Sequence, residues 1–310
     1  MPNQPPIIMR QPTFYYPDVP DLPLPDGHRF PAEKYRMLGE LTETSGLLGQ
    51  AELVPSPAAT REELLYAHDA DYIDAVFTGN LDAKIQRRIG LPWSPTLLAR
   101  SRATVGGSLA AAKNALKLGV SGQLAGGTHH AHRDFGSGFC TFNDLAVTTL
   151  ILLDEGYCER IVILDLDVHQ GDGNAAILAS TPNALVISIH GEKNFPFRKV
   201  PSDIDIGLPD NTDDVAYLQA VETALEAVQT FAPDLLLYLS GADALEADRL
   251  GRLSLSLEGL YRRDERVFQF AREQSLPVSF SIGGGYSDPI TETVSGYAGT
   301  LRSARDVFRF

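Results

Sequence analysis

Two carboxylates and an imidazole stand at alternate positions in this chain, as Asp165, Asp167 and His169. They end an apolar run at 161–164, which is typical of a buried strand. In extended backbone, side chains at positions i, i+2 and i+4 share one face. Such buried charges are costly unless a cation lies between them. The pattern therefore predicts a metal site at the end of this strand.

A third carboxylate, Asp243, follows a second apolar run at 234–239. An Asp and His set that is completed by a distant Asp suits a catalytic Zn²⁺ site with an open coordination position. Water activated at such a site needs a proton acceptor and donor, and His129 and His130 can supply both roles. Adjacent histidines reach one site only if the backbone turns sharply, and Gly126-Gly127 permits that turn. We therefore predict a metal-dependent hydrolase.

The elements that position these residues alternate along the chain. An opening strand is expected within 1–30, and a loop at 80–96. Apolar strands are predicted at 160–166, 184–189, 234–239 and 277–282. Helices are predicted from residue 33 and at 61–77, 97–118, 141–155, 213–231 and 257–274. Apolar strands with helical crossovers indicate a parallel sheet covered on both faces.

In parallel sheets of this kind, ligands bind beyond the carboxyl ends of the strands. The polar clusters of this sequence lie at such ends: His129 and His130, Asp167 and His169, Ser188 and His190, Asp243, and Tyr286. Their shared position places the active site independently of any motif.

Some of the same segments are also compatible with other functions. The glycines at 171–176 fit a dinucleotide-binding pattern, but Asp165, Asp167 and Asp172 would crowd the pyrophosphate. The glycine-rich turn at 283–285 would leave Tyr286 free to reach the site. Alternatively, Tyr286 is a packed side chain on this turn. Phe139 is either core or site wall, and Cys140 is expected to be a buried apolar residue rather than a nucleophile.

Composition narrows the function classes. The 310 residues are 44% hydrophobic and carry a net charge of −14. The two cysteines are too few for a disulfide framework. Acidic charge disfavours nucleic acid; it is compatible with cationic substrates or with solubility alone. No secretory signal and no membrane-spanning run is evident, so a cytoplasmic enzyme that binds no membrane is expected.

Five segments together resemble the zinc-dependent histone deacetylase family, which includes acetylpolyamine amidohydrolases and acetoin-utilisation proteins. They are 126–130, 137–144, 165–173, 241–243 and 283–286, in this order. Gln170 and the segment 88–95 resemble the class IV-like, bacterial branch. The resemblance implies a single arginase-like α/β domain over residues 1–310. Its core would be an open eight-stranded parallel sheet with helices on both faces.

The resemblance also implies a role for each matching residue. Asp167, His169 and Asp243 would bind the metal, Zn²⁺ with Fe²⁺ as the alternative. His129 and His130 would form a dyad held by Asp165 and Asp172, and Tyr286 would donate to the oxyanion. Gly138 and Phe139 would line the acyl-lysine tunnel, with Phe195 opposite. A structural K⁺ or Na⁺ would bind Asp165, Ser188 and the carbonyls of Asp167 and His169.

The expected activity is hydrolysis of an acetyl or related acyl group from lysine side chains of peptides or proteins. Two alternatives stay open: a deacetylase of small molecules such as acetylpolyamines, and a silent acyl-lysine-binding protein. An arginase-like ureohydrolase would need a second acidic ligand two residues after Asp243, where Leu245 stands.

Overall fold

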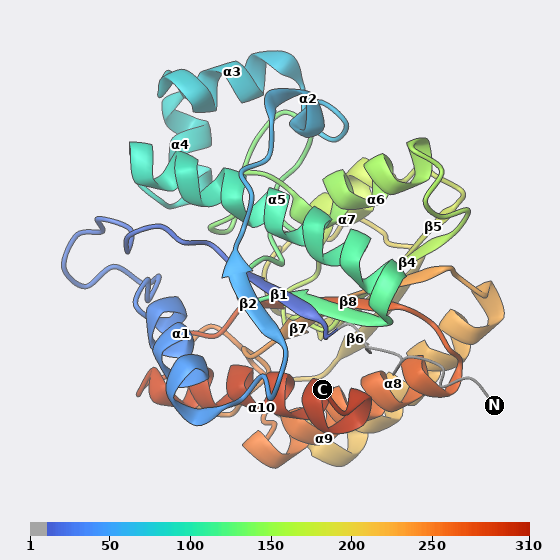
Figure 1. Ribbon diagram of the computed structural model, residues 1–310. Coiled ribbons are helices and arrows are strands. Elements are labelled where there is room, and N and C mark those ends of the chain that lie inside the picture. Colours follow the sequence, from blue (N-terminus) through green and yellow to red (C-terminus); the bar gives the residue numbers. More distant parts are fainter. Residues whose placement is uncertain (1–10) are drawn as a thin grey trace.

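One open sheet of eight parallel strands organises residues 11–310, the part of the chain that this computed structural model describes (Figure 1). The strand order is β2-β1-β3-β8-β7-β4-β5-β6. The eight-stranded α/β fold predicted above is therefore confirmed. The strands are β1 Thr13–Tyr16, β2 Glu52–Pro55, β3 Val120–Gln123, β4 Ile161–Asp165, β5 Ala184–Gly191, β6 Ile204–Leu208, β7 Leu235–Gly241 and β8 Val278–Gly283.

Helices cover both faces of this sheet because the central strands are apolar on both sides. In β4, Ile161 and Ile163 pack toward α2, α3, α5, α6 and α7, while Val162 and Leu164 pack toward α1, α8, α9 and α10 (Figure 1). The helices are α1 Lys34–Ser45, α2 Arg61–Leu64, α3 Ala70–Thr78, α4 Ala83–Ile89, α5 Pro95–Leu118, α6 Asp144–Asp154, α7 Asp172–Leu178, α8 Asp214–Phe231, α9 Leu257–Glu273 and α10 Thr291–Phe308.

The long helix predicted at 97–118 is confirmed as α5, which begins two residues earlier. Its start follows local chemistry: Ser94 Oγ accepts from Leu97 N at 3.0 Å, and Pro95 occupies the first turn. The strand predicted within 1–30 is β1, and the first ten residues lie outside the described part. The strands predicted at 160–166, 184–189, 234–239 and 277–282 correspond to β4, β5, β7 and β8.

Two predictions between residues 61 and 96 were wrong. The helix expected at 61–77 is two helices, α2 and α3, separated by residues 65–69. The loop expected at 80–96 contains α4, which begins where Asp82 Oδ1 accepts from Lys84 N at 2.7 Å. A seven-residue helix is too short to show a clear periodicity, and its stability depends on tertiary packing. The short strands β2, β3 and β6 were not predicted for the same reason, and the 18-residue helix α10 was also not predicted.

No helix within residues 11–310 combines the length and the apolar character that crossing a membrane requires.

Candidate active site

The polar clusters converge because β4, β5, β7 and β8 lie near one another in the sheet. β4 ends at Asp165, β7 at Gly241 and β8 at Gly283. Parallel strands end at the same edge, so the residues that follow them share one region. This is the edge that the sequence predicted.

Asp167, His169 and Asp243 form a group that fits one metal ion. Their candidate ligand atoms all lie within 4.8 Å of one another. His169 Nδ1 is 3.0 Å from Asp167 Oδ1 and 3.1 Å from Asp243 Oδ2. Two carboxylates and one imidazole suit Zn²⁺. Within residues 11–310 this is the one group of three or more acidic, His or Cys ligands with such spacing.

The charges of this group also call for a cation. Burial lowers the pKa of His169, but its hydrogen bonds to Asp167 and Asp243 outweigh burial and raise it to about 10. The imidazole therefore holds a proton between two buried carboxylates, in the position where a metal ion would balance the same charges. Asp243 is oriented by its other oxygen, Oδ1, which accepts from Val168 N at 2.9 Å.

A glycine allows the turn after β8 to pack against Asp243. Gly284 has a φ of +62°, and a Cβ at this position would lie 2.1 Å from Asp243 Oδ2. Any side chain here would displace the carboxylate. The glycine-rich segment after β8 thus packs directly against the group formed by Asp167, His169 and Asp243.

His129 and His130 lie beside the metal group, each paired with a carboxylate. His129 Nδ1 is 2.7 Å from Asp165 Oδ2, and His130 Nδ1 is 2.7 Å from Asp172 Oδ1. Their ring centroids are 4.1 Å apart, so both rings do face one region. The turn that brings them there uses Gly126 and Gly127, with φ of +100° and +65°.

The two histidines differ in charge. Burial, followed by the positive charge of His129, lowers the pKa of His130 to about 3 against the opposing effect of Asp172. For His129, burial is outweighed by Asp165 and Asp167, which raise its pKa to about 9. At neutral pH, His129 is therefore protonated and His130 is neutral. A neutral imidazole can accept a proton.

The structure also brings in His132, which belongs to none of the motifs described above. His132 Nε2 is 3.1 Å from Asp172 Oδ2, so Asp172 contacts two histidines. These contacts outweigh burial and lower the pKa of Asp172. The only available signal in the sequence was the i, i+2 spacing of His130 and His132.

Tyr286 lies at the same site with its hydroxyl protonated. Burial, followed by the charges of Asp167 and Asp243, raises its pKa well above the ordinary value. Its backbone N–H donates to Asp248 Oδ2 at 2.5 Å. The buried Lys34 lies with Nζ 4.7 Å from the ring centroid of Tyr286 and 2.9 Å from Gly285 O. Nothing in the sequence pattern indicated this lysine.

Gly138, Phe139 and Phe195 line the cleft above these groups. The backbone of Gly138 and Phe139 is left-handed, with φ of +54° and +66°. For phenylalanine this conformation is strained. It is held because Phe139 N donates to Ile89 O at 2.8 Å, at the end of α4. The helix that the sequence missed therefore positions Phe139.

Phe195 contacts the dyad directly. Its ring meets His130 edge to face, with centroids 4.9 Å apart. A Cβ on Gly138 would lie 2.6 Å from the His130 ring, so glycine is required between the loop and the imidazole. The whole cleft has a volume of about 890 Å³.

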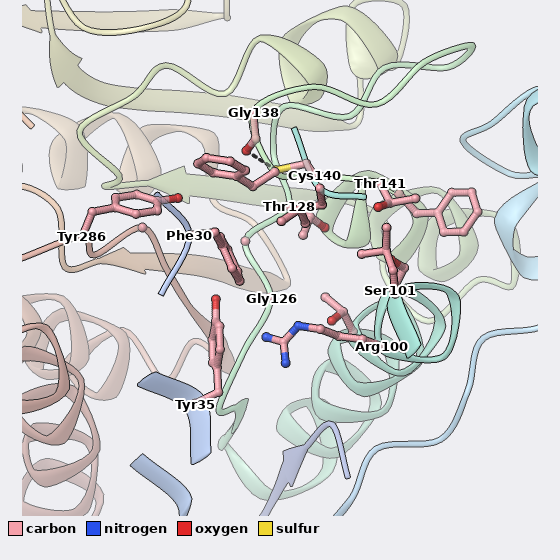
Figure 2. A pocket seen from close by; sticks show the side chains of 17 residues that line it. Phe30, Tyr35, Arg100, Ser101, Gly126, Thr128, Gly138, Cys140, Thr141 and Tyr286 are labelled. Carbon is pink, nitrogen blue, oxygen red and sulfur yellow. Dashed lines mark hydrogen bonds between the residues drawn. The ribbon is translucent and has the colours of Figure 1, made fainter. Parts of the chain in front are cut away.

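A second, smaller cavity of about 60 Å³ adjoins the cleft, with Tyr286, Gly138 and Phe139 in both walls. Figure 2 shows Arg100 pointing toward Tyr35 inside it. The Arg100 guanidinium carbon lies 4.1 Å from the Tyr35 ring centroid. Cys140 also borders this space; burial raises its thiol pKa well above the ordinary value, so it is no nucleophile.

The residues expected for a monovalent cation also lie together. Asp165 pairs in register with Ser188 across β4 and β5, and both are buried. Asp165 Oδ1 accepts from Asp167 N at 3.2 Å, while Ser188 Oγ lies 3.0 Å from His190 Nδ1. The bound ion stays a prediction.

A buried arginine on α9 ties together the loops that carry Asp167 and Asp243. Arg263 Nη1 donates to Gly241 O at 2.6 Å and to Leu166 O at 3.4 Å, and its Nε donates to Asp264 Oδ1 at 2.9 Å. Arg263 is 1% exposed. No motif of the sequence singles out Arg263, although Asp264 stands on the apolar face of α9 between Leu260 and Phe268.

We expect Arg263→Leu to lower the free energy of unfolding by about 3–5 kcal/mol, because Asp264 is left buried without its partner. Urea denaturation of the metal-free protein measures this loss. The neighbouring Arg262→Leu is the matched control: Arg262 forms an exposed pair with Glu258, worth about 0.3–0.5 kcal/mol. Equal effects of both substitutions would show that the buried network does not stabilise the loops.

The glycines of the dinucleotide-like pattern serve the histidine segment. A Cβ on Gly173 would lie 2.3 Å from Ala131 O, and one on Gly171 would lie 2.4 Å from Asp165 Oδ2. These glycines permit close backbone packing beside the metal group, as the sequence analysis favoured.

Known proteins with similar sequences include members of the family that the five sequence segments resemble. The histone deacetylase domain profile matches residues 28–300. An uncharacterized protein of Picosynechococcus is 42% identical over 298 residues, which cover 96% of this chain and 99% of that protein. Histone deacetylase 2 of Arabidopsis thaliana is 30% identical over 84% of this chain and 70% of its own. Histone deacetylase 1 of Homo sapiens is 29% identical over 90% of this chain and 61% of its own length.

Proposed function

Since this chain belongs to the histone deacetylase family, we propose that it is a metal-dependent amidohydrolase that removes acetyl or related acyl groups from lysine side chains of peptides or proteins. The observation that carries the proposal is the juxtaposition of the metal-binding group with a neutral His130 and a protonated Tyr286. Amide hydrolysis needs these three functions at one carbonyl: Lewis acidity, a base and an oxyanion donor.

Asp167, His169 and Asp243 would hold the metal, which supplies Lewis acidity toward the amide carbonyl and toward water. His130 accepts the proton of the attacking water and returns it to the amine nitrogen as the carbon–nitrogen bond breaks. Asp172 holds Nδ1 of His130, leaving Nε2 for this transfer. The protonated His129 beside it stabilises negative charge, with Asp165 as its partner.

Tyr286 donates its hydroxyl to the carbonyl oxygen as negative charge develops there. Phe139 and Phe195 flank the path of the acyl-lysine side chain, whose slim alkyl part matches apolar walls. The proposal includes a structural monovalent cation. It also includes membership of the class IV-like branch, which Gln170 suggests.

The direct test is turnover of acetyl-lysine peptides by protein loaded with a defined metal. We expect release of free lysine peptide that stops when a chelator removes the metal and resumes when Zn²⁺ returns. Binding of the peptide without turnover would favour the silent acyl-lysine-binding alternative instead.

Tyr286→Phe tests the oxyanion donor, since it deletes one oxygen and almost no volume. We expect kcat to fall about 10²–10³-fold, because the lost hydrogen bond strengthens only in the transition state. KM should change far less. Steady-state kinetics on the acetyl-lysine peptide measure both, and a kcat within about threefold of the parent, less than about 1 kcal/mol, would reject the role.

A further inference from the structure

The mouth of the active-site cleft is basic, although the chain carries a net charge of −14. Six cationic side chains line it, and we call them the cationic rim: Arg29, Arg88, Lys193, Arg198, Arg249 and Arg252. The carboxylates among the described lining residues are Asp167 and Asp172. Both are buried and engaged with histidines. The rim therefore presents positive charge to an incoming substrate.

Most of this positive charge is not neutralised within residues 11–310. Arg29, Arg88 and Arg198 have no carboxylate within 4.0 Å in the described part of the chain. Arg88 instead lies over the ring of Phe135, 3.6 Å from its centroid, which leaves its charge in place. Arg249 reaches Asp288 only at 4.0 Å.

The remaining two cations share one carboxylate. Arg252 Nη2 lies 2.7 Å from Asp210 Oδ2, and Lys193 Nζ lies 3.6 Å from the same oxygen. One negative charge cannot balance both. Together with Arg29, Arg88 and Arg198, the side chains that line the mouth of the cleft thus keep an excess of positive charge.

The rim comes from four segments that surround the cleft. They are the loop before α1, the end of α4, the loop between β5 and β6, and the loop between β7 and α9. The loop after β5 also carries Phe197, which is 87% exposed at the mouth. A substrate that extends out of the cleft would meet arginines and an aromatic surface, and a short one would not use them.

From this arrangement, and resting on the proposed function, we infer that the substrate is an acyl-lysine within an acidic peptide segment, with Asp or Glu side chains next to the acylated residue. Guanidinium groups bind carboxylates through paired hydrogen bonds. The same rim repels cationic acetylpolyamines, so that alternative is disfavoured despite the acidic composition of the chain. Phe197 offers an apolar contact for a residue beside the acyl-lysine.

The test uses the metal-loaded full chain and three acetyl-lysine peptides of equal length, flanked by Glu, by Gln or by Lys, together with an acetylated polyamine. We expect kcat/KM to be about tenfold higher for the Glu peptide than for the Gln peptide, since each exposed ion pair contributes at most about fivefold. The Lys peptide and the polyamine should be poorer still. The preference should shrink at high salt, because exposed charges are screened.

Arg198→Glu isolates the rim. Its kcat/KM should fall about fivefold for the Glu peptide and rise for the Lys peptide. Lys117→Glu is the matched control: Lys117 is exposed at the end of α5, just before β3 begins, at the opposite edge of the sheet. It should leave the preference unchanged.

Each contrary result has a separate meaning. Equal turnover of all three peptides, or better turnover of the polyamine, would overturn the inference while leaving the proposed deacetylase function standing. Turnover of none of them would reject the proposed function itself. A DNA oligonucleotide that inhibits at lower concentration than the Glu peptide would overturn the inference by assigning the rim to nucleic acid.

Discussion

Asp243→Asn is expected to abolish metal retention and deacetylation together. The amide keeps the size of the side chain and the acceptor for Val168 N, but it removes one of two anionic ligands. Catalytic zinc sites typically rest on three protein ligands, so the loss of one should release the metal. Metal content after dialysis and turnover of an acetyl-lysine peptide measure the two effects.

The stability of the same variant excludes misfolding as the cause. Burial and the charge of Asp167 raise the pKa of Asp243, so its ionised form is disfavoured in the metal-free fold. The neutral amide removes this penalty and also one charged partner of His169, so a cooperative melting transition of the metal-free variant is the evidence that its fold is intact. Zinc should raise the melting temperature of the parent only, since a ligand stabilises the fold it binds.

Two other outcomes would contradict the assignment. A variant that keeps one equivalent of metal and its full kcat would show that Asp243 is not a ligand. Two equivalents of metal in the parent, with Asp243 bridging them, would favour the ureohydrolase-type centre.

His130→Ala is expected to lower kcat by about 10²–10⁴-fold while metal content stays near normal, because the lost group transfers protons and binds no metal. KM should change little, since the metal and Tyr286, rather than His130, would bind the substrate carbonyl. Steady-state kinetics and metal analysis on the same preparation measure both quantities. His129→Ala should be milder if His129 chiefly stabilises charge.

His132→Ala is the matched control for deleting a histidine at this site. It removes a ring that contacts the same carboxylate, Asp172, at 3.1 Å, without touching the proposed base. We expect its kcat to fall much less than that of His130→Ala. If His129→Ala and His130→Ala both lose metal, the pair are ligands rather than a dyad.

The central strands β4, β5, β7 and β8 and the edge at which they end could be predicted from local sequence patterns. Continuous apolar runs such as 161–164 and 235–239 bury on both sides, so they are strands of a covered parallel sheet. Because parallel strands end together, Asp167, Asp243 and Tyr286 had to share one region. The family resemblance then supplied the pairing of each histidine with a carboxylate.

The residues that support and surround that region could not be predicted, because they come from segments far apart in the sequence. Arg263 reaches Leu166 from a helix almost one hundred residues later in the chain. Helix α4 holds the strained Phe139 from outside its own segment. The cationic rim gathers residues from four loops, and a net charge of −14 cannot reveal it. Local propensity and composition report neighbours in sequence, whereas these contacts and charges depend on which distant segments the fold brings together.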